Sequence, residues 1–208
     1  MPKLQIVRLE DVGERTIAIE VDAPVDFEAY PGQFVLVRET IDGEEETGYY
    51  TISSPTAKET FEITVAVDPD GTLGPWLSAR TLDDELTVEG PFGDIQYTGD
   101  NDAVVLAGGP GIGPAIGIAE SARDENYDVT VVYGGSNPPH GRRLTALEQD
   151  GATIVFSTDL STAVDSLDLS GAETYVFGFQ SFVNETKIAL TEAGIDLEDV
   201  EIESFGPE

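Results

Sequence analysis

The segment Val104-Val-Leu-Ala-Gly-Gly-Pro-Gly-Ile-Gly-Pro114 joins a short apolar run to a cluster of glycines. A run of β-branched and apolar residues that ends in glycine predicts a buried parallel strand, a tight turn and then a helix. Pro114 suits the first turn of that helix, where its missing N–H is no loss. Free backbone N–H groups and the helix dipole favour a phosphate there. The segment lacks the Rossmann glycine spacing and the P-loop lysine, so a glycine-rich connection without a ligand is the alternative interpretation.

Working outward, the composition limits the classes of protein to consider. The chain has 208 residues, enough for one large domain or two small ones. It carries 41 acidic and 10 basic side chains, a net charge of -31, which repels nucleic acid and anionic membranes. The acids are spread along the chain, as expected of a halophilic protein in molar salt, where the Debye length is only ~3 Å. No apolar run reaches the ~20 residues of a membrane span and no signal peptide is evident, so we expect a cytoplasmic protein.

The chain has no cysteine. This excludes disulfides, thiolate zinc sites and any iron–sulfur cluster held by cysteines of this chain. We expect no metal site. If electrons pass through the protein, an organic cofactor must carry them.

The first part of the chain has short segments with alternating or β-branched residues, separated by Pro, Gly and Asp clusters. Six such strands without a long helical pattern predict a small antiparallel barrel. The predicted strands are Leu4–Leu9, Thr16–Val21, Phe34–Arg38, Gly48–Ser53, Phe61–Val67 and Glu85–Glu89.

After residue 98 the pattern changes to apolar strands alternating with helices, which predicts a parallel sheet covered by helices. We therefore expect two domains, a barrel over residues 1–98 and an α/β domain over residues 99–208. Gly194 is expected to end the last helix. The predicted strands are Val104–Ala107, Val129–Tyr133, Thr153–Phe156 and Thr174–Phe177, and the predicted helices are Pro114–Ala122, Leu144–Gln149 and Ser181–Ala193.

Glycines follow three of these strands, at Gly108, Gly134 and Gly178. The carboxyl ends of parallel strands meet at one edge of a sheet, where open α/β sheets bind ligands. Three glycine loops at that edge favour a dinucleotide cleft over simple connections.

With these motifs in order, the chain resembles the ferredoxin–NADP reductase superfamily, which pairs a flavin-binding barrel with an NAD(P)-binding domain. The resemblance extends over nearly the whole chain. It rests on the segments Tyr30-Pro-Gly-Gln-Phe34, Gly48-Tyr-Tyr-Thr-Ile-Ser-Ser54, Gly71-Thr-Leu-Gly74, Gly90-Pro-Phe-Gly93, Leu106–Pro114, Phe177-Gly178 and Glu201-Ile-Glu-Ser-Phe-Gly206.

The resemblance implies FAD and NAD(P)H as cofactors. Tyr50 would stack on the flavin, Thr51 would bond near its N5 atom, and Phe205 would cover the nicotinamide side. Thr51, Glu203 and Phe205 are the implied catalytic residues, although strand propensity and core packing are competing explanations for Thr51 and Phe205. The implied cofactor-binding residues are Tyr50, Thr51, Ile52, Ser53, Ala66, Val67, Gly71, Thr72, Leu73, Gly74, Gly108, Gly109, Pro110, Gly111, Ile112, Gly113, Pro114, Gly134, Ser136, Gly178, Phe179 and Phe205.

The chain departs from the family pattern at several positions. Gly48 replaces the arginine that neutralises the flavin pyrophosphate, and Gly74 replaces a serine. A charge-assisted contact contributes ~1.5–3 kcal/mol, so FAD binding is expected to weaken ten- to a hundredfold unless Arg38, Arg80 or molar counter-cations neutralise the pyrophosphate instead. Phe177 replaces a cysteine and Phe179 a proline.

Nucleotide preference is left open by the sequence. Ser136 stands where the family often has arginine, while Arg142 and Arg143 follow shortly after. These two could grip the 2′-phosphate of NADP or lie on a helix surface. His140 is expected to be a solvated loop residue.

The leading hypothesis is an FAD-dependent oxidoreductase that transfers hydride or electrons between NAD(P)H and an acceptor protein such as a ferredoxin. It would act as a monomer or homodimer. One alternative is a flavin reductase that uses free flavin as a substrate. Another is a catalytically silent nucleotide-binding or electron-transfer subunit, suggested by the departures at Gly48, Gly74 and Phe177.

Overall fold

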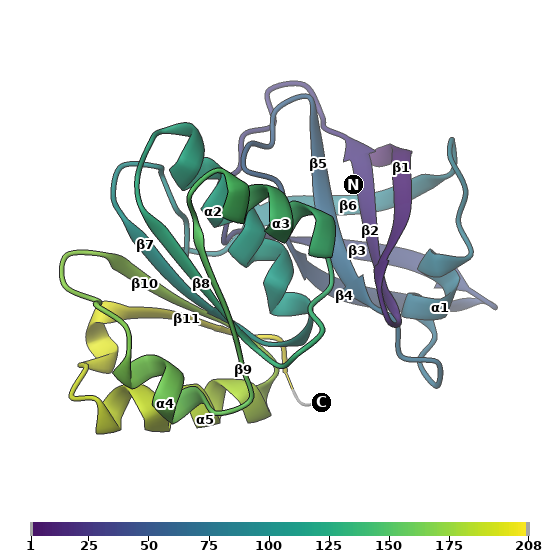
Figure 1. The fold of residues 1–208 in the computed structure, drawn as a ribbon. Coiled ribbons are helices and arrows are strands. Elements are labelled where there is room, and N and C mark those ends of the chain that lie inside the picture. The colour runs from purple at the N-terminus through teal and green to yellow at the C-terminus, as the bar shows by residue number, and fades with distance from the viewer. Residues whose placement is uncertain (1, 207–208) are drawn as a thin grey trace.

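The structure, a computed structural model, describes residues 2–206 and contains two β-sheets that follow one another along the chain. Figure 1 shows the antiparallel sheet of the N-terminal half beside the helix-covered sheet of the C-terminal half. Both predicted sheet types are confirmed. No helix among residues 2–206 is long and apolar enough to cross a membrane.

The first sheet is antiparallel, with strand order β4-β3-β6-β1-β2-β5. Its edge strands meet at a bridge between Ile52 and Ile63, and the Ile52 amide donates to the Gln33 carbonyl at 2.9 Å. The sheet therefore curls into a barrel, as the six short strands predicted. Its strands are β1 (Lys3–Gly13), β2 (Thr16–Asp22), β3 (Phe34–Ile41), β4 (Glu44–Thr51), β5 (Thr60–Ala66) and β6 (Glu85–Phe92).

Inward-facing residues of these strands form the barrel core. Ile6, Ile19, Phe61 and Leu86 are almost completely buried in it. Burying each such side chain contributes about 1.5–3 kcal/mol, which explains why alternation was a reliable signal here. The short helix α1 (Leu73–Ser78) closes one side by burying two leucines.

The second sheet is parallel, with strand order β11-β10-β7-β8-β9. Within this sheet, the first strand along the chain is the central strand β7. The next two strands, β8 and β9, lie on one side of it, and β10 and β11 lie on the other side. The direction of winding thus reverses between β7 and β10, and such a switch point is where open α/β sheets bind ligands. The strands are β7 (Ala103–Ala107), β8 (Val129–Gly134), β9 (Thr153–Ser157), β10 (Glu173–Gly178) and β11 (Val200–Ser204).

Helices cover both faces of this sheet. Two of them, α2 (Ile112–Asp124) and α3 (Gly141–Gln149), share one core with the sheet, on the side that faces the barrel in Figure 1. The other two, α4 (Leu160–Asp165) and α5 (Gln180–Glu192), share a second core on the opposite face. Gly194 follows α5 with a φ of 81°, which agrees with its predicted role at the helix end.

Several elements were absent from the predicted set. These are α1, α4, the one-turn 3₁₀ helices η1 (Gly109–Gly111) and η2 (Leu197–Asp199), and the fifth strand β11. The four helices are six residues long or shorter and offer too few turns for a periodic signal, and β11 (VEIES) lacks the apolar run by which the other strands of this sheet were predicted.

Candidate functional site

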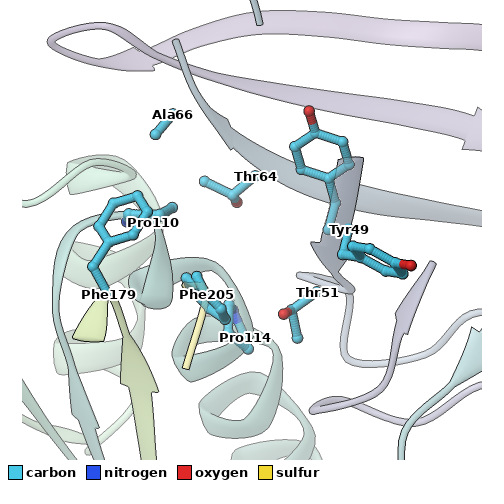
Figure 2. Close-up of a pocket in the computed structure, with 9 residues that line it drawn as sticks. Tyr49, Thr51, Thr64, Ala66, Pro110, Pro114, Phe179 and Phe205 are labelled. Carbon is cyan, nitrogen blue, oxygen red and sulfur yellow. The ribbon is translucent and has the colours of Figure 1, made fainter. Parts of the chain in front are cut away.

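A pocket lies between the barrel and the carboxyl edge of the parallel sheet. Figure 2 shows side chains from both halves of the chain converging on it. The barrel contributes residues of β4 and β5. The C-terminal half contributes residues of η1 and α2 and the residues that directly follow β10 and β11. The lining residues are Tyr49, Tyr50, Thr51, Thr64, Ala66, Pro110, Pro114, Phe179 and Phe205.

On the barrel side, β4 carries two adjacent tyrosines and Thr51 to the pocket. Thr51 is 8% exposed. Burial raises the pKa of Tyr50 to about 12, so its hydroxyl is neutral at physiological pH. A Cβ at Gly48 would lie 2.7 Å from the Tyr50 hydroxyl and 2.9 Å from Leu73. Tyr50 therefore fills the space beside Gly48, and any larger residue there requires its ring to move.

On the opposite side, the loop after β7 forms η1 and leads directly into α2. A Cβ at Gly111 would lie 2.1 Å from the Phe177 carbonyl oxygen, so only glycine fits. No side chain caps the first turn of α2. The Gly111 amide donates to the Gly108 carbonyl at 3.0 Å, and the Ile112 amide donates to carbonyls within η1. Phosphate binding at the start of this helix stays a prediction.

The C-terminal segment after β11 supplies a further pocket wall. The Phe205 amide donates to the Gly178 carbonyl at 2.9 Å, and the Gln180 amide donates to Gly206 at 3.0 Å. These bonds hold the Phe205 ring edge-to-face against Phe179, with centroids 6.3 Å apart. Such aromatic pairs add about 0.5–1.5 kcal/mol to their area burial.

Glu203 pairs with Phe177 in the ladder between β10 and β11. It is half-buried and is not among the residues that line the pocket. Burial raises the pKa of its carboxyl group. A carboxyl group with a raised pKa near a pocket is suited to hold or release a proton.

Three of the predicted cofactor-binding glycines have a packing role that the sequence analysis missed. A Cβ at Gly108, Gly134 or Gly178 would lie 2.4, 2.5 or 2.7 Å from the ring of Phe182 on α5. The ends of three parallel strands thus lack side chains because one aromatic ring covers them. The sequence signal was the glycine after each strand, but it could not show that Phe182 fills the space.

Other predicted site residues lie outside the pocket lining. Four of them pack in or against the two cores: Ile52 and Leu73 lie in the barrel core, Ile112 lies in the core of the second sheet, and Val67 packs against the barrel core. Gly113 and Ser53 meet at the contact between α2 and the barrel. The remaining positions are on the surface or partly buried: Gly71, Thr72, Gly74, Gly109 and Ser136.

Neither candidate substitute for the missing arginine lines the pocket. Arg38 donates to Glu45 at 2.8 Å, and Arg80 stacks 4.0 Å from the ring centre of Trp76. All nine lining residues are uncharged. Such a pocket, with aromatic faces and the hydroxyls of two tyrosines and two threonines, fits a flat aromatic ring system, but it offers a pyrophosphate no cationic side chain.

Two expectations about the loop after β8 need correction. His140 is buried rather than solvated, at 4% exposure, because it packs between the barrel and α3. Arg143 points to the barrel and bonds Glu62 and Glu120, so it lies on neither a free helix surface nor a phosphate site. Arg142 is exposed.

Comparison with known proteins agrees with this geometry. The sequence profile of the family described as the oxidoreductase FAD-binding domain matches residues 3–97. The chain is 39% identical over 124 residues to the glycine betaine monooxygenase reductase subunit of Chromohalobacter salexigens, covering 57% of this chain and 33% of that protein. It is 24% identical to flavohemoprotein A of Dictyostelium discoideum, covering 85% of this chain and 52% of that protein. The chain thus spans between a third and about half of these relatives.

Solved structures share the whole architecture. The FAD/NAD-binding domain of nitric oxide dioxygenase from Vibrio cholerae superposes with a TM-score of 0.83 at 18% identity, over 99% of this chain and 98% of that one. The ferredoxin reductase in carbazole 1,9a-dioxygenase gives 0.81 at 22% identity, over 98% of this chain and 66% of that one.

Residues 3–97 thus match the family model described as the oxidoreductase FAD-binding domain, and the whole chain has the two-sheet fold of the solved structures above.

Proposed function

We propose that this chain transfers hydride or electrons between NAD(P)H and a redox partner protein, using FAD held by the barrel. The single observation that carries the proposal is the uncharged pocket to which both halves contribute aromatic faces. A flavin and a nicotinamide from separate binding domains could meet only at such a place. When bound, FAD supplies the ring that accepts hydride from the nicotinamide.

We propose the two domains as residues 1–98 for FAD and 99–208 for NAD(P). In this proposal the Tyr50 ring stacks on the flavin and the Thr51 hydroxyl orients it by a hydrogen bond. The start of α2, at Gly111 to Pro114, binds the nicotinamide pyrophosphate at the positive end of the helix dipole. Phe205 covers the nicotinamide side and gives way when the dinucleotide enters, and Glu203 holds a proton.

Partner proteins are proposed from the relatives. One is named a reductase subunit of a monooxygenase and another a ferredoxin reductase of a dioxygenase. A ferredoxin or an oxygenase component is therefore a suitable acceptor for this chain. The proposal includes a cytoplasmic location and a monomeric or homodimeric state.

The test is a spectrum of the purified protein in molar potassium chloride, with FAD supplied. We expect a flavin absorption band that bleaches when NADH or NADPH is added without oxygen. Replacing Thr51 by Ala should slow bleaching by at least tenfold, because the reacting ring loses a positioning bond. A protein that takes up no FAD, or whose bound flavin neither nucleotide reduces, would contradict the proposal.

A second candidate, a reductase that uses free flavin as a substrate, is favoured by one observation. No cationic side chain lines the pocket and Gly48 stands at the arginine position. Flavin affinity separates the two candidates. Copurification of stoichiometric FAD supports a bound cofactor, and rapid exchange at micromolar or weaker affinity supports a flavin substrate.

A further inference from the structure

One arginine of the second half of the chain bonds directly to the barrel. Arg143 on α3 donates from Nε and Nη2 to the two carboxylate oxygens of Glu120 on α2, at 2.8 and 2.7 Å. Its Nη1 donates to Glu62 of β5 at 2.6 Å, and its Nη2 also donates to the Ser53 carbonyl at 2.8 Å. The guanidinium therefore ties α2 and α3 to two barrel segments.

On the barrel side of this contact, one buried carboxylate bonds to two arginines. The Glu62 side chain is 5% exposed, and its second oxygen accepts from Arg8 of β1 at 2.8 Å. Arg8 in turn donates to Glu20 at 2.9 Å. Burial raises the pKa of Glu62, and the two guanidinium groups oppose that shift. Because buried pairs are screened little by salt, this contact is expected to persist in molar salt.

A second link lies three residues earlier in the chain. His140 has a left-handed backbone with a φ of 60°, and its amide donates to the Val12 carbonyl at 2.8 Å. Its Nε2 lies 2.9 Å from the Thr64 hydroxyl, which lies 2.7 Å from the Ser53 hydroxyl. The start of α3 is thus bonded to the barrel through both backbone and side chains.

These links act on segments that form the pocket walls. Thr64 lines the pocket, and Ser53 follows Thr51 by two residues on the same segment. Pro114, on the opposite wall, belongs to α2, the helix that also carries Glu120. One cluster therefore connects the barrel wall with the wall formed by the second sheet.

We propose that Arg143, supported by His140, is a positioning residue that sets the separation between the two pocket walls and thereby the approach of nicotinamide to flavin. This inference rests on the proposed function. Hydride transfer needs reacting atoms about 3–3.5 Å apart, and a displacement of about 1 Å can cost ~100-fold in rate. Arg143 touches neither ring; it acts by fixing Ser53, Glu62 and Glu120 relative to one another.

The test compares the Arg143→Met and Arg123→Met variants as FAD-loaded full chains. In the Arg143→Met variant, we expect the rate constant of flavin reduction at saturating NAD(P)H to fall ten- to a hundredfold. The dissociation constants of FAD and nucleotide should change less than threefold, because their phosphate contacts lie elsewhere. A reduction rate within twofold of wild type would overturn the proposal.

Arg123 provides the matched control because its ion pairs stay within the second half of the chain. It lies on α2, pairs with Asp128 and Asp150, and donates to the Tyr127 carbonyl. Arg123→Met should leave the reduction rate unchanged. An equal loss in both variants would mean that any lost arginine contact slows the reaction, and would overturn the specific role of Arg143.

A second variant and a second readout guard against failure to fold. Glu120→Gln weakens the contact while Glu62 keeps both arginines, and should slow reduction three- to tenfold. The second readout is hydrogen exchange at the Ser53 amide of the apoprotein, which donates to the Glu62 carbonyl at 2.8 Å. Exchange at this amide should become faster in the Arg143→Met and Glu120→Gln variants. It should not change in the Arg123→Met variant. Unchanged exchange in the Arg143→Met and Glu120→Gln variants would overturn the inference. A wild-type chain that binds no FAD would instead contradict the proposed function, with the exchange result still deciding whether the contact forms.

Discussion

The protonation of His140 depends on the contact between the barrel and the start of α3, in which this residue is buried. Burial, together with the nearby charges of Arg143 and Arg8, lowers its pKa from 6.5 to about 3. The imidazole is therefore neutral in the folded protein at every pH above about 3. In the unfolded chain the same group binds a proton below its ordinary pKa of about 6.5.

Between these two pKa values the unfolded state binds one more proton than the folded state, so stability falls as pH is lowered. His140 alone should cost about 1.4 kcal/mol per pH unit below pH 6.5. His140→Asn should remove this contribution, because asparagine cannot become charged and tolerates the left-handed backbone. The measurement is urea unfolding from pH 4 to 7 for both proteins. Parallel stability curves would show that His140 is not held neutral.

The same residue marks the limit of what sequence could predict about the site. Thr51, Pro114 and Phe205 were predicted from local motifs, and all three line the pocket. The roles of His140 and Arg143 depend on partners 76 and 81 residues away in sequence, at Thr64 and Glu62. No local pattern encodes such a partner, so the histidine was predicted to be a solvated loop residue, and the arginine was left open between a phosphate ligand and a helix-surface residue.

At the scale of elements, α2 approaches the barrel through glycines on one face. A Cβ at Gly113 would lie 2.5 Å from the Thr64 hydroxyl and 2.6 Å from the Ser53 hydroxyl. A Cβ at Gly117, one turn later, would lie 3.1 Å from backbone atoms of Ser53 and Ser54. The sequence analysis assigned Gly113 to phosphate binding, whereas the structure shows that it also permits the helix to touch the barrel.

Gly113→Ala should therefore destabilise the protein by about 1–3 kcal/mol, since an extra methyl group overpacks this contact. The matched control is Gly141→Ala on α3, where a Cβ meets nothing within 4 Å. There the substitution should be neutral or stabilise the protein by up to ~1 kcal/mol, because alanine loses less backbone entropy. Urea unfolding of the two variants checks this. Equal stability of both would mean that α2 is not tightly packed on the barrel.

Element prediction succeeded where one physical rule acts locally. Barrel strands such as β1 and β6 alternate where one face is buried, and the central strand β7 is apolar throughout because both faces are buried. The sequence did not predict α4, which has only six residues. It also did not predict β11, because Glu201 and Glu203 make this strand, which pairs with β10, look like a polar segment. An edge strand is defined by its neighbour, and that neighbour is distant in sequence.

At the scale of the whole molecule, the net charge of -31 sets the conditions under which these contacts operate. Surface ion pairs such as Lys3 with Glu85 and Arg38 with Glu45 engage few of the 41 acidic side chains. Most of the acids therefore repel one another across the surface, which favours expansion. The Debye length shortens from about 10 Å at 0.1 M salt to about 3 Å at 1 M, so salt removes this repulsion.

We therefore expect the melting temperature to rise between 0.1 and 2 M potassium chloride, in contrast to a protein held together by exposed ion pairs. Removing part of the repulsion by mutation should reduce this rise in melting temperature. Glu44, the first residue of the edge strand β4, and Glu46 on the same strand are suitable targets, since no ion pair of the described residues uses them. The Glu44→Gln/Glu46→Gln variant should be more stable than wild type at 0.1 M and converge with it at 2 M. A melting temperature that falls with added salt would mean that exposed ion pairs outweigh the repulsion. The Arg143 contact, buried between barrel and sheet, should respond least, because salt screens the surface and not the interior.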